Sequence, residues 1–230
     1  AVQHEAWRAG LAPPPTFGTE VVARSLGLRD NHPFGQEQLE LYPTDAITRA
    51  EAAHSFAVAL RWKGTAGETA HATFASFVLP AYTRAQRQVL HLAVAKIGMP
   101  YVWGGETDAA GSWYGGQAHG GYDCSGFAWR VFKLSGFAWG RQIRGRTAAS
   151  QAGEIQRAAR VRLDDVRPAD LVFFGAARFW QKATPTRIVH EGIALSPDWM
   201  IHSSGQGVYV SQLRLDPWRA KRFSWARRVL

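Results

Sequence analysis

The sequence is poor in sulfur. Among 230 residues it has two methionines and one cysteine, Cys124. A single cysteine excludes an internal disulfide and any zinc site that needs several thiolates. Two interpretations of Cys124 remain: a buried thiol that fills core space, or a nucleophile.

Long hydrophobic runs are also absent. No stretch of 18 consecutive apolar residues occurs, so we expect no membrane-spanning helix. The opening residues AVQHEAWRAG lack the basic and then apolar pattern of a signal peptide, which predicts a mature secreted form or a cytosolic chain. Apolar residues still make up 46% of the sequence, enough for a folded core.

Acidic side chains are outnumbered, with 18 Asp and Glu against 27 Lys and Arg, for a net charge of +9. Such a surface favours an anionic partner, such as nucleic acid, an anionic membrane or an anionic cell-wall polymer, or it serves solubility alone. The basic residues form no long block and zinc-finger spacing is absent. We therefore expect no nucleic-acid binding.

Two regions with different patterns divide the chain. Residues 1–80 predict a Pro- and Ala-rich arm and a helical segment, whereas residues 81–230 predict helices followed by short strands rich in β-branched and aromatic residues. Helices are expected at 19–28, 47–62, 83–98, 124–136 and 147–158, and the arm at 1–18. Strands are expected at 169–175, 187–195, 199–204 and 207–213. This order indicates an α+β fold with an antiparallel sheet.

Cys124 falls at the expected start of the helix over 124–136. The partial positive charge of a helix N-terminus favours thiolate over thiol, so this position predicts a lowered pKa. Asp123, directly before it, fits the N-cap position.

Eight histidines supply candidates for a base that would serve the sulfur. His119 lies in the glycine-rich loop before Cys124, whereas His190 and His202 fall in two strands expected to form a hairpin. A turn centred on Ser196 would place those two directly opposite, with Cβ atoms about 4.5–5.5 Å apart. One imidazole could then orient the other toward the sulfur. The alternative is a cross-strand pair in a polar groove far from the thiol.

Five motifs in order make residues 98–213 similar to the NlpC-type cell-wall cysteine peptidases: GMPYVWGG, YDCSGFAWRVF, RPADLVFF, VHEGIAL and WMIHSSGQGV. The resemblance implies a papain-like domain, in which a Cys-bearing helix packs on an antiparallel sheet. It also implies that Cys124 is the nucleophile, His190 the base and His202 the polar residue that orients the base.

The resemblance further implies an enzyme of the bacterial cell envelope or a secreted one, with no metal or cofactor. Its substrates would be the peptide stems of peptidoglycan, commonly cut between D-Glu and a diamino acid joined through the γ-carboxyl. Tyr101 would approach the nucleophile and the substrate, where it could donate to the oxyanion. Asp123 and Ser125 would bind a free stem amino terminus, although a plain helix cap fits Asp123 equally well.

The chain departs from the family pattern at several places. Ala169 stands where the family usually has glycine, and Glu191 where it has a small apolar residue. In a strand, Glu191 would point away from the face of His190. Longer insertions at 105–121 and 176–187 could narrow or roof the groove.

A segment of the N-terminal region, LYPTDAITRAEAAHSFAVAL, resembles the S-layer homology module, which implies either wall binding or a helical appendage packed on the main domain. Two other functions stay open beside the peptidase. One is a wall-binding protein without turnover. The other is an amidase or acyltransferase on a related papain-like fold.

Overall fold

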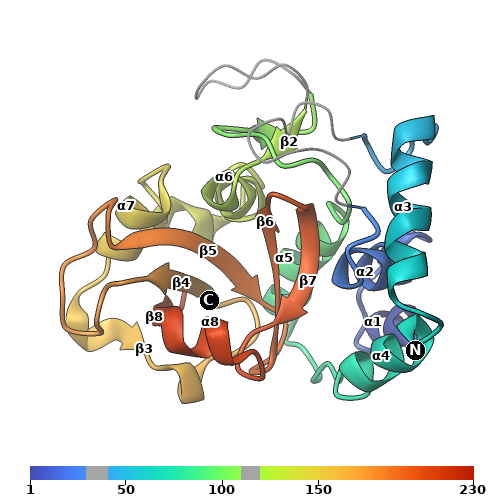
Figure 1. Cartoon of the computed structure of the whole chain (residues 1–230). Helices are drawn as coiled ribbons and strands as arrows, with labels where there is room; N and C mark the ends of the chain where they lie inside the picture. The colour runs from blue at the N-terminus through green and yellow to red at the C-terminus, as the bar shows by residue number, and fades with distance from the viewer. Residues whose placement is uncertain (30–40, 110–119) are drawn as a thin grey trace.

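Helices precede a six-stranded antiparallel sheet in the computed structural model, which describes residues 1–29, 41–109 and 120–230 (Figure 1). The strand order is β3-β8-β4-β5-β6-β7. The strands are β3 (Arg160–Val161), β4 (Leu171–Gly175), β5 (Ile188–Ala194), β6 (Trp199–Ser204), β7 (Gly207–Gln212) and β8 (Phe223–Arg227). The predicted α+β class and the four predicted strands are confirmed, each to within two residues at either end.

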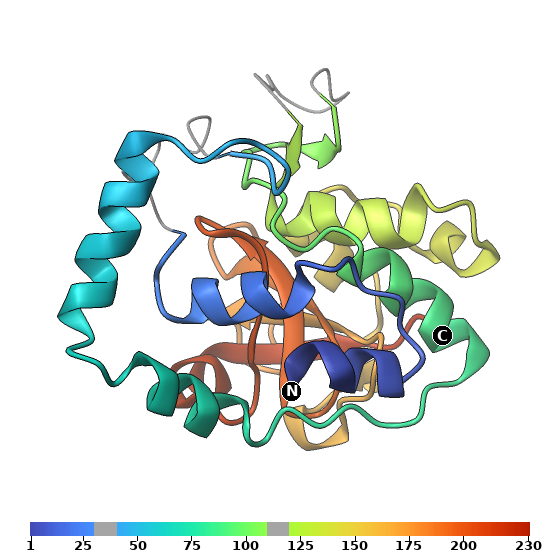
Figure 2. The same ribbon diagram turned by 90° about the vertical axis from the view of Figure 1, so that its right-hand side faces the viewer.

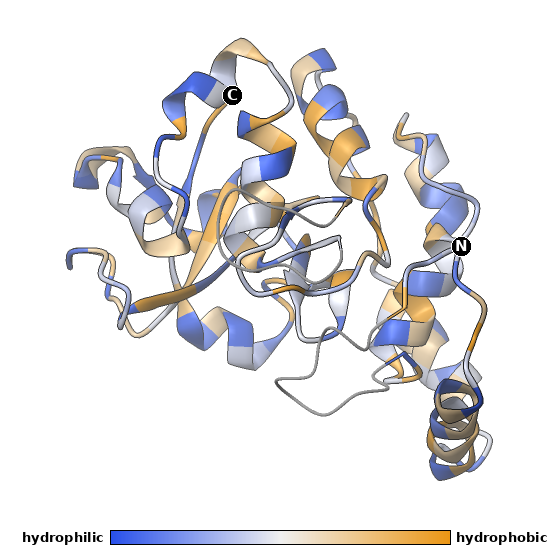
Figure 3. Cartoon of the chain, turned by 90° about the horizontal axis from the view of Figure 1, so that it is seen from above, coloured by the Kyte–Doolittle hydropathy of each residue, from blue (hydrophilic) through white to orange (hydrophobic). Residues whose placement is uncertain are grey.

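The centre of the sheet is buried on both faces. In β4, Leu171 and Phe173 point into the main hydrophobic core, whereas Val172 and Phe174 point into a smaller cluster on the other face. Coloured by hydropathy, the central strands show strong hydrophobic colour and the surrounding helices are mixed (Figure 3). The helices on the main-core face are α5 (Arg84–Val94), α6 (Cys124–Ala128) and α7 (Ala148–Gly153), while α8 (Pro217–Arg222) lies on the other side (Figure 1).

In the described part of the first 80 residues, four α-helices lie beside the sheet, with α2 against β7 (Figure 2). They are α1 (Val2–Arg8), α2 (Phe17–Ser25), α3 (Arg49–Arg61) and α4 (Ala66–Phe74). Phe74 of α4 stacks on Trp199 of β6, with ring centroids 5.4 Å apart and an interplanar angle of 22°. Phe77 meets the same indole edge-on at 5.1 Å. The N-terminal segment thus shares one core with the sheet, in line with the packing interpretation.

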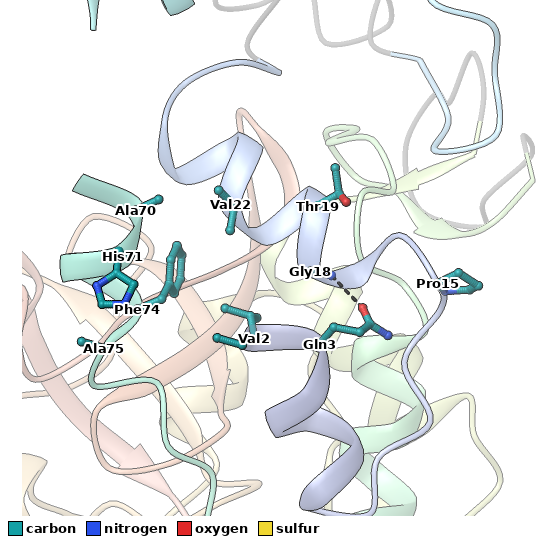
Figure 4. A pocket seen from close by; sticks show the side chains of 11 residues that line it. Val2, Gln3, Pro15, Gly18, Thr19, Val22, Ala70, His71, Phe74 and Ala75 are labelled. Carbon is teal, nitrogen blue, oxygen red and sulfur yellow. Dashed lines mark hydrogen bonds between the residues drawn. The ribbon is translucent and has the colours of Figure 1, made fainter. Parts of the chain in front are cut away.

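A cavity of about 370 Å³ lies between α1, α2 and α4 (Figure 4). Val2, Val22 and Phe74 give it an apolar lining. At its edge, the Gln3 side-chain oxygen accepts a hydrogen bond from the backbone N–H of Gly18 at 2.9 Å. That bond ties α1 to the first turn of α2.

The predicted extended arm over 1–18 is wrong, because α1 occupies part of it. Only two residues of this seven-residue helix, Val2 and Ala6, are buried. Two buried positions are too few to show a helical periodicity in the sequence. The helix α4 and the strand β8 were not predicted either. The strand β8 follows β7 in the chain but lies between β3 and β4 in the sheet. No local sequence pattern predicts this pairing.

The helices α3 and α5 both begin after a threonine N-cap, but their caps differ. Thr83 and Gln86 form a complete box at the start of α5. At α3, the Thr48 side chain accepts from the backbone N–H of Glu51 at 3.1 Å. The Glu51 carboxylate, however, pairs with Arg29 at 3.2 Å, so that box is only half formed.

Ala169 has a backbone conformation that glycine adopts more readily than alanine. Its φ of +69° lies in the left-handed region, which costs a residue with a Cβ about 1–2 kcal/mol. Two backbone hydrogen bonds hold the turn, from Ala169 N–H to Ala194 at 2.8 Å and from Ala194 N–H to Asp170 at 2.9 Å. The turn thereby sets the start of β4 against the end of β5.

Because the N-terminal helices share the core, we expect Phe74→Ala to destabilise the whole chain. Loss of the stacked ring should lower the free energy of unfolding by about 3 kcal/mol in one cooperative urea transition. Phe56→Ala on α3 is the matched control, since Phe56 is 71% exposed and its loss should cost less than about 0.5 kcal/mol. Two separate transitions, with only the first shifted, would contradict a shared core.

Candidate active site

Cys124 begins α6, as predicted, and Asp123 is its N-cap. The Asp123 side chain accepts a hydrogen bond from the backbone N–H of Gly126 at 2.5 Å. Gly126 is required in this turn, because a Cβ there would come within 1.9 Å of the backbone oxygen of Gly105. The helix continues through a π-helical turn at Trp129–Lys133, so most of the expected helix over 124–136 is present.

The Cys124 sulfur lies where β5 separates from β6. These strands pair at Ile193↔Ile201 and Ala194↔Met200 and not at the residues before them in β5. The backbone N–H of Glu191 instead lies near enough to the Cys124 thiol to lower its pKa. The α6 N-terminus therefore meets β5 one residue from His190.

His190 and His202 contact each other directly. The Nε2 atom of His190 is 2.8 Å from the Nδ1 atom of His202, and the ring centroids are 4.9 Å apart. His190 is half-buried and His202 is buried. The predicted pairing of the two imidazoles is thus present in the structure.

The predicted register of this pair is wrong by two residues. The hairpin turn is centred on Pro197 rather than Ser196, so Gly192 and not His190 lies across from His202. The two histidines are diagonal neighbours, which side chains of this length can bridge. Gly192 leaves the room, since a Cβ there would come within 3.0 Å of the His202 Cβ.

Ser211 extends the hydrogen-bond chain beyond the histidines. Its hydroxyl is 2.9 Å from Nε2 of His202, and the Tyr209 ring centroid is 4.4 Å from that of His202. Both residues come from β7, where Tyr209 pairs with His202 in register. The sequence analysis missed them, although the alternation of the GVYVSQ strand after WMIHSS could have placed both on the histidine face.

The hydrogen bonds fix which ring nitrogen of His190 is available. Its Nε2 is engaged with His202, so Nδ1 is the nitrogen left to exchange a proton with a thiol. A neutral His190 that donates from Nε2 needs His202 to accept at Nδ1 and to donate from Nε2 to the Ser211 oxygen.

Both imidazoles have lowered pKa values. Burial, together with the positive charge of Arg219, lowers the pKa of His190 to about 4. Burial, the neighbouring His190 and Arg219 hold the pKa of His202 well below its usual range. Both rings are therefore neutral at pH 7, and His190 is free to accept a proton.

The expected low pKa of Cys124 is wrong for the free protein. Burial raises the pKa of the thiol, and the carboxyl groups of Asp123 and Glu191 add to this effect. The backbone N–H groups of Glu191 and Ser125 oppose it only in part. The resting pair is thus a neutral thiol and a neutral imidazole, and the sulfur depends on a base for activation.

Glu191 lies in the main core face, away from His190, as predicted. It pairs in register with Phe173 and is fully buried. Within the described part of the chain, neither of its carboxyl oxygens has a hydrogen-bond partner. Burial raises the pKa of Glu191 well above its ordinary value, which favours its protonated form, and any negative charge that it carries opposes formation of the thiolate.

Asp123 and Ser125 are held by a cation that the sequence analysis did not assign. Arg146 donates from Nη1 to Asp123 at 3.0 Å and to the Ser125 hydroxyl at 3.0 Å, while its Nε pairs with Glu106 at 2.6 Å. Arg146 lies in the RGRTAASQ segment, residues 144–151. The helix-cap role of Asp123 is confirmed, and amine binding by Asp123 and Ser125 stays a prediction.

Tyr101 lies beside the cysteine segment, where it forms a parallel bridge with Tyr122. Its contact with an oxyanion stays a prediction. His119, the other candidate base, lies outside the described residues, as do residues 110–119 of the insertion over 105–121. In the described ranges, no cluster of three or more His, Cys, Asp or Glu side chains could hold a metal ion. No helix there is both long and apolar enough to cross a bilayer.

The lowered pKa of His190 predicts an acid-sensitive site. We expect its ring to titrate near pH 4, measured by ring-nitrogen chemical shifts in NMR. The neutral form is favoured by folding, so the associated stability is present above the unfolded value of about 6.5 and is lost as pH falls toward 4. A titration midpoint near 6.5 would contradict burial beside Arg219.

Gly192→Ala should disturb the histidine pair. The added methyl forces the His202 backbone away, which should lengthen the imidazole hydrogen bond and lower the free energy of unfolding by about 1–3 kcal/mol. Loss of the shared N–H proton signal in NMR would report the first effect. Gly205→Ala is the control, because a Cβ at Gly205 meets nothing within 4 Å. An unchanged proton signal in Gly192→Ala would refute the close approach.

Two proteins of Bacillus subtilis are similar to slightly more than half of this chain. The gamma-D-glutamyl-L-lysine dipeptidyl-peptidase of Bacillus subtilis (strain 168) is 30% identical over 120 residues, which are 52% of this chain and 32% of that protein. The probable peptidoglycan endopeptidase LytE of the same organism is 32% identical over 136 residues, 57% of this chain and 32% of that protein. This chain thus spans about a third of the length of these relatives.

Solved structures of related domains also align. An NlpC/P60 family protein from Bacillus cereus ATCC 10987 aligns with a TM-score of 0.47 and 22% identity, over 65% of this chain and 41% of that one. The P60 domain of the M. avium subspecies paratuberculosis antigen MAP1204 aligns with a TM-score of 0.46 and 25% identity, over 64% and 95%. The family model for NlpC/P60 matches residues 98–227, more than half of the sequence, and this chain therefore belongs to the NlpC/P60 family.

Proposed function

We propose that this chain is a peptidoglycan endopeptidase that hydrolyses the amide between D-Glu and a diamino acid in peptide stems. Cys124 is the nucleophile, His190 the base and His202 the residue that orients it. The observation that carries the proposal is the 2.8 Å hydrogen bond between the two imidazoles, with the Cys124 thiol near the backbone N–H of Glu191, the residue after His190. Family membership and the names of the relatives support the substrate class.

In the first half-reaction, the sulfur attacks the amide carbonyl carbon while the thiol proton passes to Nδ1 of His190. The tetrahedral oxyanion forms next to the N-terminus of α6, where the Cys124 backbone N–H and the Tyr101 hydroxyl are the candidate donors. The C–N bond then breaks. His190 returns the proton to the leaving amine, and a thioester joins the acyl half to Cys124.

In the second half-reaction, a water molecule gives a proton to Nδ1 of His190 and attacks the thioester carbon. The C–S bond breaks, the acid product leaves, and the sulfur takes the proton back. A neutral thiol paired with a neutral base fits this sequence, because the proton moves only as the new bond forms. No step requires a metal or a cofactor.

His202 and Ser211 hold His190 in the tautomer that the reaction needs. With Nε2 donating to His202, the His190 ring cannot turn its lone pair away from the sulfur without breaking a buried hydrogen bond. The low polarity around both rings strengthens this bond relative to one in water. His202 is thus a positioning residue rather than a group that touches the substrate.

A cell-wall location fits the charge of the chain. The net charge of +9 favours anionic polymers of the envelope over neutral surfaces. We infer that the protein acts outside the cytoplasm, and that such a polymer is a second, electrostatic partner beside the peptide stems.

Purified sacculi incubated with wild-type protein and with Cys124→Ala test the function. The wild type should release muropeptides that mass spectrometry identifies as products of cleavage after D-Glu, and the variant should release none. The melting temperatures of both proteins show whether the variant folds. Equal release by both proteins would end the proposal.

The products released from sacculi also distinguish an endopeptidase from the alternative functions. A wall-binding protein would co-sediment with sacculi and release nothing in either form. An amidase would free whole stems that keep L-Ala at their amino end. An acyltransferase would need an added amine acceptor before product appeared.

A further inference from the structure

Five basic side chains gather around the loop over residues 176–187, which joins β4 to β5. Arg178 and Lys182 belong to the loop, and Arg157, Arg160 and Arg162 lie in or beside β3. Together they form a surface, the basic patch. It lies toward the β3 edge of the sheet, away from β7 and the N-terminal helices (Figure 1).

Direct contacts hold the two segments of the patch together. Nη1 of Arg160 donates to the backbone oxygens of Phe179 and Gln181, the second at 2.8 Å. The Arg162 guanidinium lies over the Phe179 ring, 4.5 Å from its centroid. Burial, and after it the positive charge of Arg157, lowers the pKa of Arg160. The loop and the β3 segment therefore present their cations on one continuous surface.

The positive charge of the patch is not neutralised. Within the described part of the chain, none of its five cations forms an ion pair. Glu154 is already paired with Arg227 at 2.6 Å. Asp164 and Asp165 follow Arg162 in the sequence without pairing with it, so five cations face at most two free carboxylates. Cations that repel one another in this way favour a bound anion, because it relieves the repulsion.

An exposed aromatic ring lies inside the patch. Trp180 is 64% exposed, and it stands between Phe179 and Gln181, the two residues whose backbone oxygens Arg160 binds. An indole offers a flat apolar face, which fits the apolar face of a sugar ring. Cations beside that face fit a sugar that also carries an acidic group.

The form of the patch favours a flexible polymer over a single small anion. Each exposed ion pair contributes little, so one small anion would bind weakly. A chain that carries many anionic groups contacts several cations at once, and each further contact then forms at high effective concentration.

Two other polyanionic partners fit the patch less well. Surfaces for single-stranded nucleic acid stack successive bases on several aromatic rings, whereas Trp180 is the one exposed ring among residues 176–187. Interfacial binding to a bilayer uses an amphipathic helix, whereas the patch consists of a loop, a short turn and a two-residue strand.

The patch lies beside the candidate active site. The loop ends where β5 begins, and His190 is the third residue of that strand. The loop also packs on the end of α7, since a Cβ at Gly153 would lie 3.5 Å from the Cβ of Ala183. A polymer bound to the patch would thus follow the flank of the site without occupying its catalytic residues.

We propose that the basic patch and Trp180 are a docking surface for an anionic glycopolymer of the cell wall. The proposal rests on the proposed function for the location of the protein, and it deepens the electrostatic partnership by assigning it to one surface. It also gives the insertion at 176–187 a role in holding the enzyme to the wall beside the peptide stems.

Polygalacturonate, a chain of carboxylated sugar rings, is the probe, and isothermal titration calorimetry at low salt measures its binding. The test variant is the triple substitution Arg157→Gln, Arg178→Gln and Lys182→Gln. The charged ends of these side chains make no hydrogen bond within the described residues, so their loss should leave the fold intact. The affinity should fall roughly 10-fold, the combined effect of three exposed charge contacts.

A second triple variant controls for net charge. Arg49→Gln, Arg61→Gln and Lys63→Gln remove the same three charges from exposed positions on and after α3. This variant should bind polygalacturonate within about twofold of the wild type. Equal weakening in both triple variants would mean that net charge and not the patch binds the polymer, which overturns the proposal.

Trp180→Ala tests the sugar contact. It should weaken binding of polygalacturonate several-fold and leave binding of inorganic polyphosphate, which has no rings, unchanged. Trp218→Ala is the matched control, because Trp218 is 62% exposed and lies on α8. Equal effects of Trp180→Ala on both polymers, or on neither, overturn the sugar contact. Tighter, patch-dependent binding of single-stranded DNA than of polygalacturonate would assign the surface to nucleic acid instead.

Muropeptide release separates this proposal from the proposed function. On sacculi that retain their anionic polymer, the patch variant should release products several-fold more slowly than the α3 control variant. On a soluble stem peptide, both should stay within about twofold of the wild type, since no reacting group has changed. Equal release by the two variants overturns the docking surface alone. If the wild type releases nothing and cuts no peptide, the proposed function fails, and the calorimetry still decides the docking surface.

Discussion

The site depends on one structural constraint, the point at which β5 leaves β6. Paired strands would use the Glu191 N–H in the sheet, but here that N–H lies near the Cys124 thiol at the start of α6 and lowers its pKa. The separation brings the thiol to the level of the sheet, next to the residue whose imidazole lies on the opposite face. In this way a residue on a helix that packs on one face of the sheet can lie close to a side chain on the other face.

Burial at this point shapes the electrostatics of every group around it. It lowers the pKa values of both imidazoles and raises the pKa values of the thiol and of Glu191. Charge is concentrated instead in an outer network, where Arg146 forms ion pairs with Asp123 and Glu106. The proposed catalysis consequently begins from uncharged partners, with the cap of α6 tied down by an ion pair.

The N-terminal helices are part of the same structure rather than an appendage with a separate core. Phe74 and Phe77 close over Trp199, which belongs to the strand that carries His202. A displacement of these helices would therefore affect the strand that carries His202.

Sequence and tertiary structure determined different parts of this protein. Local sequence patterns predicted the strand β6 and the helix α5, and the motifs singled out Cys124, His190 and His202, because these features depend on neighbours within a few residues. The register of the histidine hairpin, the insertion of β8 and the contacts of Ser211, Arg146 and Arg219 could not be predicted this way. They follow from which segments meet after folding. The raised pKa of Cys124 belongs with them, since a helix start is visible in a sequence, whereas the burial that outweighs it exists only once the core has closed.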